Sequence, residues 1–168
     1  CKLFLVIDAI ISVYFIYFAV MNLPQLNLPI TVLKTKLVEG TTQVFDEVRK
    51  KYLVLTPEGW VRQHFIHYLN QEKNYPLGLM GVEKMVKYNS MQTRADIVLY
   101  ATDGKPNMIV ECKAPNVKIT QDTFNQIAKY NFKLQVPLLV VTNGIQHFCC
   151  QMDYENNSIR FIEEIPKF

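Results

Sequence analysis

The chain has 168 residues, of which 49% are hydrophobic and 20% are charged, and its formal net charge is +3. This composition excludes a disordered chain, and the length fits a single globular domain. So small a net charge also excludes nucleic-acid binding by the surface as a whole, so that any such affinity requires a local basic face.

The sequence has neither the motif of a phosphate-loop ATPase nor that of a zinc finger. The sequence contains no Gly-x-x-x-x-Gly-Lys-Ser/Thr phosphate loop, so it encodes no motor ATPase of that kind. Its four cysteines lack zinc-finger spacing, and the adjacency of Cys149 and Cys150 disfavours a disulfide between them. This cysteine usage favours a cytoplasmic location, where thiols stay reduced.

The chain begins with an apolar run, residues 3–20, that contains the single charge Asp8. The run is long enough to span a bilayer or to act as a signal segment. However, Cys1 is not a normal start, and Met21 follows the run immediately. Residues 1–20 are therefore expected to be a mis-extended start rather than a membrane anchor.

Residues 21–43 are expected to form an extended arm, because Pro24 and Pro29 interrupt helix and strand alike. The folded domain is expected to span residues 44–168. It opens with the basic triplet Arg49-Lys50-Lys51, which forms either a solvated face or a contact to nucleic-acid phosphates.

The sequence Thr56-Pro57-Glu58 predicts a helix start, with a threonine N-cap, a proline in the first turn and an acidic residue that caps the helix. The apolar positions that follow define its buried stripe: Val61, Phe65, Tyr68 and Leu69.

A strand is predicted at Leu79–Tyr88, and residues 89–93 turn the chain back. Residues 94–113 are then predicted to form a β-hairpin. Its arms, Arg94–Tyr100 and Met108–Lys113, flank the polar turn Asp103–Pro106.

Three charged residues interrupt the apolar arms of this hairpin. Because alternate side chains of a strand face opposite ways, Glu111 and Lys113 share a face with Ile109, whereas Cys112 faces the other way. On the partner arm Asp96 is expected on one face with Val98 and Tyr100, opposite Ala95, Ile97 and Leu99. If the arms pair in register, Asp96 and Glu111 converge with Lys113 beside them.

Charges in apolar strands are costly unless they are paired or bind a metal. One interpretation is a structural ion pair of Lys113 with Asp96 or Glu111. The other is a Mg²⁺ site, since hard cations prefer carboxylates together with phosphate oxygens, and a nearby lysine can orient water and stabilise phosphate charge.

A second helix is predicted to begin near Thr120, with Gln126 and Tyr130 one turn apart on one stripe. Another stripe faces the sheet: Phe124, Ile127, Ala128 and Leu134. Asn143-Gly144 predicts a hairpin between strands at 137–142 and 145–150, and a last strand is expected at Ile159–Ile162.

Asp96 followed by Glu111-x-Lys113 on an apolar strand resembles the PD-(D/E)XK nuclease signature. The spacing of Gln126 and Tyr130 resembles the Gln-x-x-x-Tyr motif of its RecB-like branch. Ala95 departs from the motif, which has proline there, although that position is not a ligand.

Four stretches together resemble the N-terminal nuclease domain of type I restriction enzyme R (HsdR) subunits, in a short standalone form. They are Thr56–Gln63, Arg94–Val98, Val110–Pro115 and Val141–Gly144. The resemblance covers roughly residues 42–168. It implies an α/β, restriction-endonuclease-like fold, with a mixed central β-sheet flanked by helices in an αβββαβ core.

The resemblance implies a Mg²⁺-dependent endonuclease that hydrolyses DNA in restriction-modification or in DNA repair and defence, with Mn²⁺ as a substitute metal. Asp96, Glu111 and the main-chain carbonyl of Cys112 are then expected to bind the metal. Lys113 is expected to position or deprotonate water. Supporting roles are expected for three residues, Gln126 and Tyr130 and, as an auxiliary residue, Glu58.

DNA is the expected partner, with Arg49, Lys50, Lys51 and Arg94 as candidate contacts. Other restriction-system subunits are expected to supply motor and specificity. An alternative is a module of the same fold that binds nucleic acid or a subunit without cutting. A membrane-tethered protein of unrelated role follows only if residues 3–20 are genuine.

Overall fold

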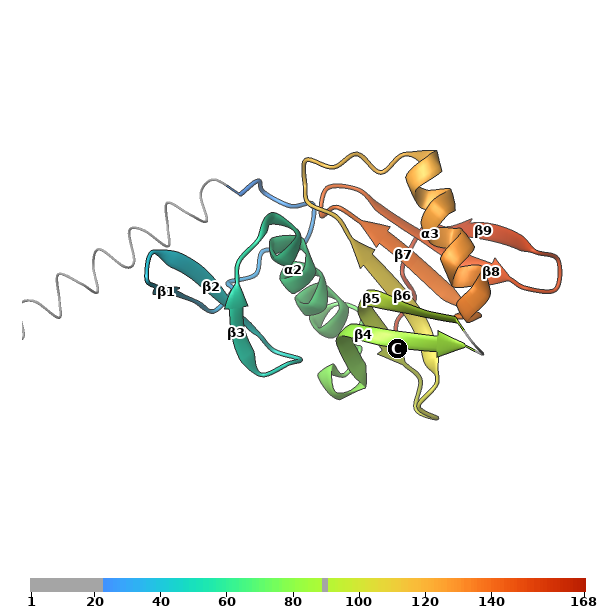
Figure 1. The fold of residues 1–168 in the computed structure, drawn as a ribbon, viewed down its shortest axis with the longest axis horizontal. Helices are drawn as coiled ribbons and strands as arrows, with labels where there is room; N and C mark the ends of the chain where they lie inside the picture. Colours follow the sequence, from blue (N-terminus) through green and yellow to red (C-terminus); the bar gives the residue numbers. More distant parts are fainter. Residues whose placement is uncertain (1–22, 89–90) are drawn as a thin grey trace, which may run out of the picture.

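The computed structural model describes residues 23–88 and 91–168 (Figure 1). The expectation for residues 1–20 therefore lies outside the described residues. Within the described ranges, no helix has the length and apolarity needed to cross a membrane.

The described residues form a three-stranded and a six-stranded β-sheet, two α-helices and one short 3-10 helix (Figure 1). The elements are β1 Thr35–Val38, β2 Thr41–Asp46, β3 Lys51–Val54, α2 Pro57–Gln71, η1 Leu77–Leu79, β4 Met80–Tyr88, β5 Met91–Tyr100, β6 Pro106–Cys112, α3 Gln121–Leu134, β7 Leu138–Thr142, β8 His147–Asp153 and β9 Ser158–Ile162.

The large sheet has the order β4-β5-β6-β7-β8-β9, in which β6 and β7 run parallel and all other neighbours run antiparallel. The order α2, β4, β5, β6, α3, β7 is the αβββαβ core implied by the resemblance. The predicted fold class, an α/β domain with a mixed central sheet and flanking helices, is therefore confirmed.

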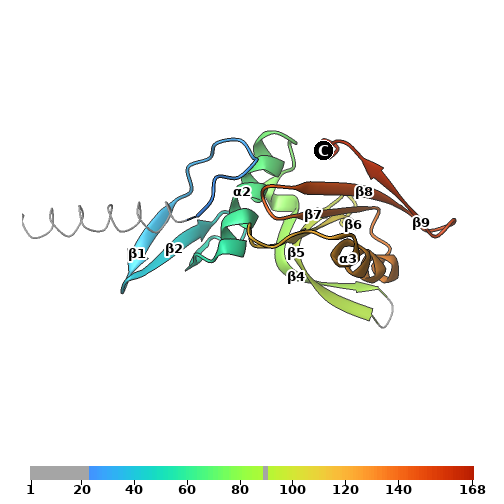
Figure 2. The ribbon, with the colours of Figure 1, turned by 90° about the horizontal axis from the view of Figure 1, so that it is seen from above.

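The two helices cover opposite faces of the large sheet (Figure 2). Val61 and Phe65 of α2 pack in one core with Ile97 and Val110. On the other face Phe124, Ile127 and Ala128 of α3 pack on residues that include Val98, Ile109 and Leu139. The central strand β6 is buried on both faces, as expected of a strand with helices above and below it.

The predicted elements of the domain are present with small shifts in their ends. Thr56 caps α2 by accepting a hydrogen bond from the Gly59 N–H at 2.9 Å, and Thr120 caps α3. The hairpins at 94–113 and around Asn143-Gly144 both form, although β5 begins at Met91, inside the segment expected to be a turn.

The N-terminal arm differs from the sequence-based expectation. Residues 35–54 fold into the antiparallel sheet β1-β2-β3, which lies beyond α2 at one end of the molecule (Figures 1 and 2). The arm expected at 21–43 thus contains β1 and the first part of β2. These strands are four to six residues long, too short for a clear alternating pattern.

One detail of the predicted alternation is wrong. Ile97 and Leu99 lie on the face opposite Val98, as expected, the first two in the α2-side core and Val98 in the α3-side core. Ala95 was expected on the face of Ile97 and Leu99 but belongs to the α3-side core. The chain is irregular here, because the β4–β5 pairing omits the Glu83–Asp96 position and Glu83 has a left-handed backbone with φ 52°. Asp96 therefore lies at a distortion of the sheet.

Candidate metal and nuclease site

Asp96 and Glu111 lie on adjacent antiparallel strands. The register pairs Ile97 with Val110, so the next position places Asp96 opposite Glu111. Asp96 Oδ2 accepts a hydrogen bond from the Cys112 N–H at 2.8 Å, which fixes one side of this carboxylate. The two acidic residues singled out in the sequence thus meet at the end of the β5–β6 ladder.

Lys113 forms an ion pair with Glu111, in which Lys113 Nζ donates a hydrogen bond to Glu111 Oε1 at 2.8 Å. Burial raises the pKa of Glu111, and the charges of Asp96 and Glu58 raise it further, while Lys113 only partly offsets them. Burial alone would lower the pKa of Lys113, but its hydrogen bond and charge interaction with Glu111 outweigh it and raise the pKa. Lys113 is therefore an ammonium group here, suited to donate hydrogen bonds rather than to accept a proton.

Helix α2 adds Glu58 and Arg62, one turn apart on its surface. Arg62 Nη2 lies 3.0 Å from Glu58 Oε1 and 3.6 Å from Asp96 Oδ1. Burial would lower the pKa of Arg62, but the nearby Asp96 and Glu83 carboxylates raise it. Glu58 thus not only stands in the first turn of the helix but also adds negative charge to the site.

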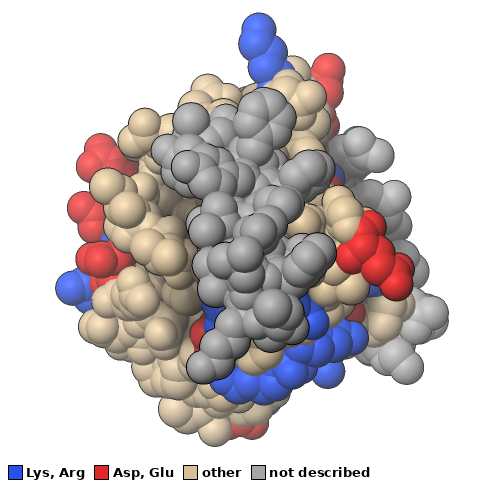
Figure 3. All heavy atoms as spheres, turned by 90° about the vertical axis from the view of Figure 1, so that its left-hand side faces the viewer, with Lys and Arg blue, Asp and Glu red and all other residues tan. Residues whose placement is uncertain are grey.

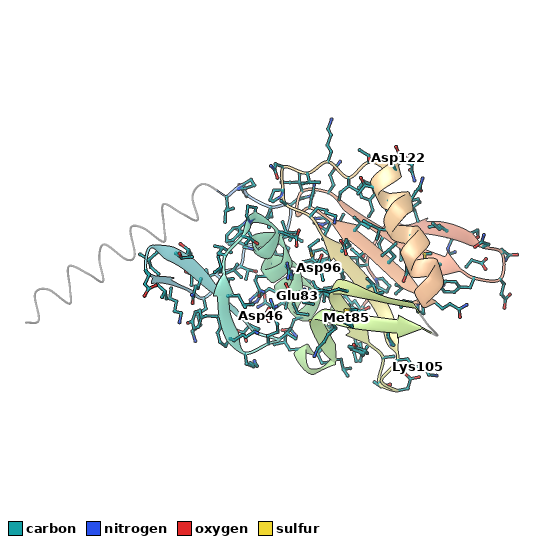
Figure 4. All side chains as sticks on the ribbon, in the orientation of Figure 1. Asp46, Glu83, Met85, Asp96, Lys105 and Asp122 are labelled. Carbon is teal, nitrogen blue, oxygen red and sulfur yellow. The ribbon has the colours of Figure 1, made fainter. Side chains whose placement is uncertain are left out.

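Glu83, like Arg62, was not predicted from the sequence as a residue of this neighbourhood; Figure 4 labels it beside Asp96. Its Oε1 accepts from Arg62 Nη1 at 2.6 Å, and its Oε2 accepts from Arg49 Nη1 at 2.7 Å and Arg94 Nη2 at 2.5 Å. Burial opposes ionisation, yet the arginines lower the pKa of Glu83 to about 2. A possible signal was Arg62 itself, a charged residue directly after the buried Val61.

The donor chemistry of the site fits a hard divalent cation. Asp96 and Glu111 offer carboxylate oxygens from two strands, and Mg²⁺ in proteins takes one or two carboxylates with the remaining positions left to water and phosphate. Burial is the main cause of the raised pKa of Glu111, and the charges of Asp96 and Glu58 add to it. Within residues 23–88 and 91–168, however, no three His, Cys, Asp or Glu side chains are grouped as a complete protein cage.

Cys112 can contribute only through its backbone. Its thiol is completely buried in the core beside α2, and burial raises its pKa well above the usual value, so that it stays protonated. A protonated thiol is a poor metal ligand. The main-chain carbonyl therefore remains the predicted donor from this residue.

Gln126 and Tyr130 are both in α3, one helical turn apart. Their side chains lie outside the described part of the structure, so their predicted supporting roles stay predictions.

The candidate nucleic-acid contacts fall into two groups. Arg49 and Arg94 are engaged by Glu83, and Arg49 also contacts Asp46. Lys50 and Lys51 are exposed, Lys51 as the first residue of β3. Lys and Arg side chains gather in a band on the face of the molecule that Figure 3 shows. Two further lysines near this sheet, Lys34 and Lys36, are also exposed and were not predicted as contacts.

A hollow of about 560 Å³ lies elsewhere, between the start of α3 and strands β8 and β9. Thr120, Phe124 and Phe161 are among its lining residues, whereas Asp96 and Glu111 are not. It is therefore separate from the carboxylate site.

Comparison with known proteins identifies the family of this chain. Residues 57–166 match the family described as type I restriction enzyme R protein N terminus. No protein among curated sequences matches the chain. A solved fragment structure assigned to an HsdR subunit of a type I restriction enzyme from Vibrio vulnificus YJ016 is 20% identical, with a TM-score of 0.46, and the match covers 67% of this chain and 24% of that chain. Because the family match spans more than half of the residues and includes α2, the β5–β6 hairpin and α3, the chain belongs to the type I restriction enzyme R protein N-terminal family.

Proposed function

We propose that the domain is a Mg²⁺-dependent endonuclease that hydrolyses DNA phosphodiester bonds, with Mn²⁺ as a substitute metal. The observation that carries the proposal is the convergence of Asp96 and Glu111 from adjacent strands, with the Lys113 ammonium on Glu111. Membership of the R protein N-terminal family supports it.

In this proposal Asp96 and Glu111 bind the metal together with the Cys112 carbonyl, and Glu58 adds negative charge beside them. The bound metal supplies Lewis-acid activation of water and of the phosphate. Lys113, as an ammonium group, donates hydrogen bonds to the attacking water or to a phosphate oxygen and stabilises the charge that develops there. This assigns Lys113 a positioning and electrostatic part rather than that of the base.

The DNA is proposed to reach this site along the band of exposed lysines that includes Lys50 and Lys51. The exposed lysines on or beside the small sheet, Lys34, Lys36, Lys50 and Lys51, are proposed to supply the local positive charge that a net charge of only +3 requires. Other subunits of a restriction system are proposed to supply motor and sequence specificity.

The test compares wild-type chain with Asp96→Asn and Glu111→Gln, which keep the shape of each side chain and remove its charge. Mn²⁺ binding is measured by titration calorimetry, and cleavage by plasmid nicking with Mg²⁺. We expect both variants to lose measurable metal binding and to nick at least about 100-fold more slowly. Asp103→Asn, in the exposed turn of the same hairpin, serves as the matched control and is expected to behave as wild type.

A folded wild-type chain that binds DNA but neither binds Mn²⁺ nor nicks the plasmid would contradict the nuclease proposal. It would support instead the non-cleaving module, with the Lys113–Glu111 contact as a structural ion pair.

A further inference from the structure

Three arginines converge on the single carboxylate of Glu83. Arg49 comes from the turn between β2 and β3, Arg62 from α2 and Arg94 from β5, with contacts of 2.7, 2.6 and 2.5 Å. Glu83 itself is in β4, next to Asp96 at the omitted position of the β4–β5 pairing. None of the proposed catalytic steps uses Glu83, so its arrangement calls for another explanation.

Arg62 is the arginine of this group that also faces the proposed metal site. Its Nη1 donates to Glu83 at 2.6 Å and its Nη2 donates to Glu58 at 3.0 Å, whereas Asp96 Oδ1 lies 3.6 Å from Nη2. The last distance is an ion pair without a direct hydrogen bond. The other oxygen of Asp96 accepts from the Cys112 N–H at 2.8 Å. Asp96 Oδ1 thus lies beside the positive charge of Arg62 but accepts no direct hydrogen bond from it.

An arginine this close to a carboxylate would ordinarily form direct hydrogen bonds, because the guanidinium fork matches the two carboxylate oxygens. Arg62 is nearly buried, with a side chain 8% exposed, so solvent offers it little competition. The contact to Glu83, which is the shorter of its two hydrogen bonds, draws the guanidinium toward β4 and away from Asp96.

We propose that Glu83 is a positioning residue that holds the Arg62 guanidinium off Asp96 Oδ1 and so leaves this oxygen to a divalent cation. The metal part of the inference rests on the proposed function. Held in this way, the Arg62 guanidinium lies beside Glu58 and Asp96 without occupying the position of the metal.

The backbone of β4 supports this role. Glu83 has φ 52°, a left-handed conformation that is unfavourable for a residue with a side chain. Such a conformation in a strand persists where the surroundings impose it, and it is found most often at functional sites. Here it breaks the alternation of β4 and accompanies the contact of Glu83 with arginines from three separate elements.

The test uses the full chain and Mn²⁺ titration calorimetry without DNA. Glu83→Gln removes the negative charge that holds Arg62, which is then free to donate to Asp96 Oδ1. Mn²⁺ must displace this charge-assisted hydrogen bond, so we expect it to bind about tenfold more weakly. Adding Arg62→Gln to Glu83→Gln removes the competing cation. The double variant is expected to bind Mn²⁺ within about threefold of wild type.

Glu83→Gln combined with Arg94→Gln is the matched control. This double variant has the same net charge as the first one, but it keeps Arg62 and removes an arginine whose side chain is 63% exposed. It is expected to stay as weak as Glu83→Gln alone. Equal recovery in both double variants would reduce the effect to net charge and overturn the proposal, as would wild-type affinity in Glu83→Gln. If Glu83 has a purely structural role, both double variants will bind Mn²⁺ no better than Glu83→Gln alone, and this result would also overturn the proposal.

A metal-free crystal structure of Glu83→Gln gives a second readout that does not depend on metal binding. We expect Arg62 Nη2 to move into hydrogen-bond distance of Asp96 Oδ1, and an unchanged 3.6 Å separation would overturn the positioning role. Failure of wild type to bind Mn²⁺ would instead contradict the proposed function, so the two failures are distinguishable. If Glu83→Gln does not fold, Glu83→Asp takes its place in both experiments, with the same direction expected because the shorter side chain retains Arg62 less well.

Discussion

At the scale of single residues, the protonation state of Lys113 depends on its neighbour Glu111. A lysine that serves as a base needs a lowered pKa, which burial without a carboxylate partner provides. Lys113 has such a partner in Glu111 at 2.8 Å, and its pKa is raised. The protonated state is therefore favoured throughout the neutral range while Lys113 is paired with Glu111, which agrees with the proposed role of Lys113 as a hydrogen-bond donor.

Glu83 makes a prediction for stability at acidic pH. Its pKa in the folded chain is about 2, below the ordinary value of 4.5, so the ionised form stabilises the fold above pH 4.5 and this stabilisation is lost as the pH falls toward 2. We expect wild type to exceed Glu83→Gln in free energy of unfolding by about 2 kcal/mol at pH 6, after allowing for the partial exposure of Glu83. Urea unfolding at pH 6, 4.5 and 3 should show this difference shrinking, and a difference that stays constant with pH would contradict it.

At the scale of elements, the small sheet is joined to α2 by one buried carboxylate. Asp46, at the end of β2, is completely buried. It accepts hydrogen bonds from the Val48 and Arg49 N–H groups, from Arg49 Nε and from Gln63 Nε2 of α2. Because Arg49 also contacts Glu83, the small sheet and strand β4 are connected through the same side chain.

Asp46→Ala is therefore expected to destabilise the chain by about 3 kcal/mol, since it leaves buried donors on Arg49 and Gln63 without their acceptor. Hydrogen exchange should locate the loss, with amides of β1–β3 exchanging faster than those of β6 and β7. The neighbouring Glu47→Ala removes a carboxylate that contacts Lys50 at 3.5 Å on the surface and accepts no buried hydrogen bond of the kind that Asp46 accepts in the described residues. Glu47→Ala should change the free energy of unfolding by less than about 0.5 kcal/mol. A similar loss of stability in both variants would contradict the role of the Asp46 carboxylate in joining the small sheet to α2.

At the scale of the whole molecule, the distribution of charge matters more than its sum. The net charge is only +3, yet Lys and Arg form a band on the side that carries β1–β3 (Figure 3). Phosphate contacts release counterions, so a band of this kind reveals itself in the salt dependence of DNA binding.

The variant Lys50→Gln/Lys51→Gln is predicted to weaken DNA binding at moderate salt and to lower the slope of log affinity against log salt concentration by about 2, one for each lost phosphate contact. Fluorescence anisotropy with a labelled duplex between 50 and 200 mM salt measures both quantities, in EDTA so that no cleavage interferes. Lys105→Gln/Lys167→Gln, at two exposed lysines outside β1–β3, removes the same charge and should leave the slope nearly unchanged. Equal slopes for the two double variants would argue against this band as the contact surface.

Local signals account for the parts of the fold that the sequence predicted. The N-cap at Thr56, the Asn143-Gly144 turn and the apolar stretch Met108–Val110 each determine structure through neighbours close in the chain. The sequence predicted that Asp96 and Glu111 converge if the hairpin pairs in register, and the structure brings these residues together, although the alternation of side chains fails next to Asp96 at Ala95.

The missed features depend on contacts between distant residues. The small sheet depends on Asp46 meeting Gln63, and neither residue suggests this in isolation. Glu83, in a strand with Lys84 and Lys87, has the pattern of a solvated charge. Its actual partners are 34, 21 and 11 residues away, and no periodicity of a single element can predict them.

The parallel pairing of β6 with β7 has a consequence for the order in which the protein can be assembled as it is synthesised. The Lys113 N–H donates to the Thr142 carbonyl at 2.8 Å, and every residue of β7 pairs with β6. A ribosome that has just released β5 and β6 still has α3 and β7 to make, so the strand that carries Glu111 is left without its second neighbour until Thr142 has emerged. The nascent chain can close the hairpin early, but it completes the support beneath the carboxylates only when most of the domain has left the exit tunnel.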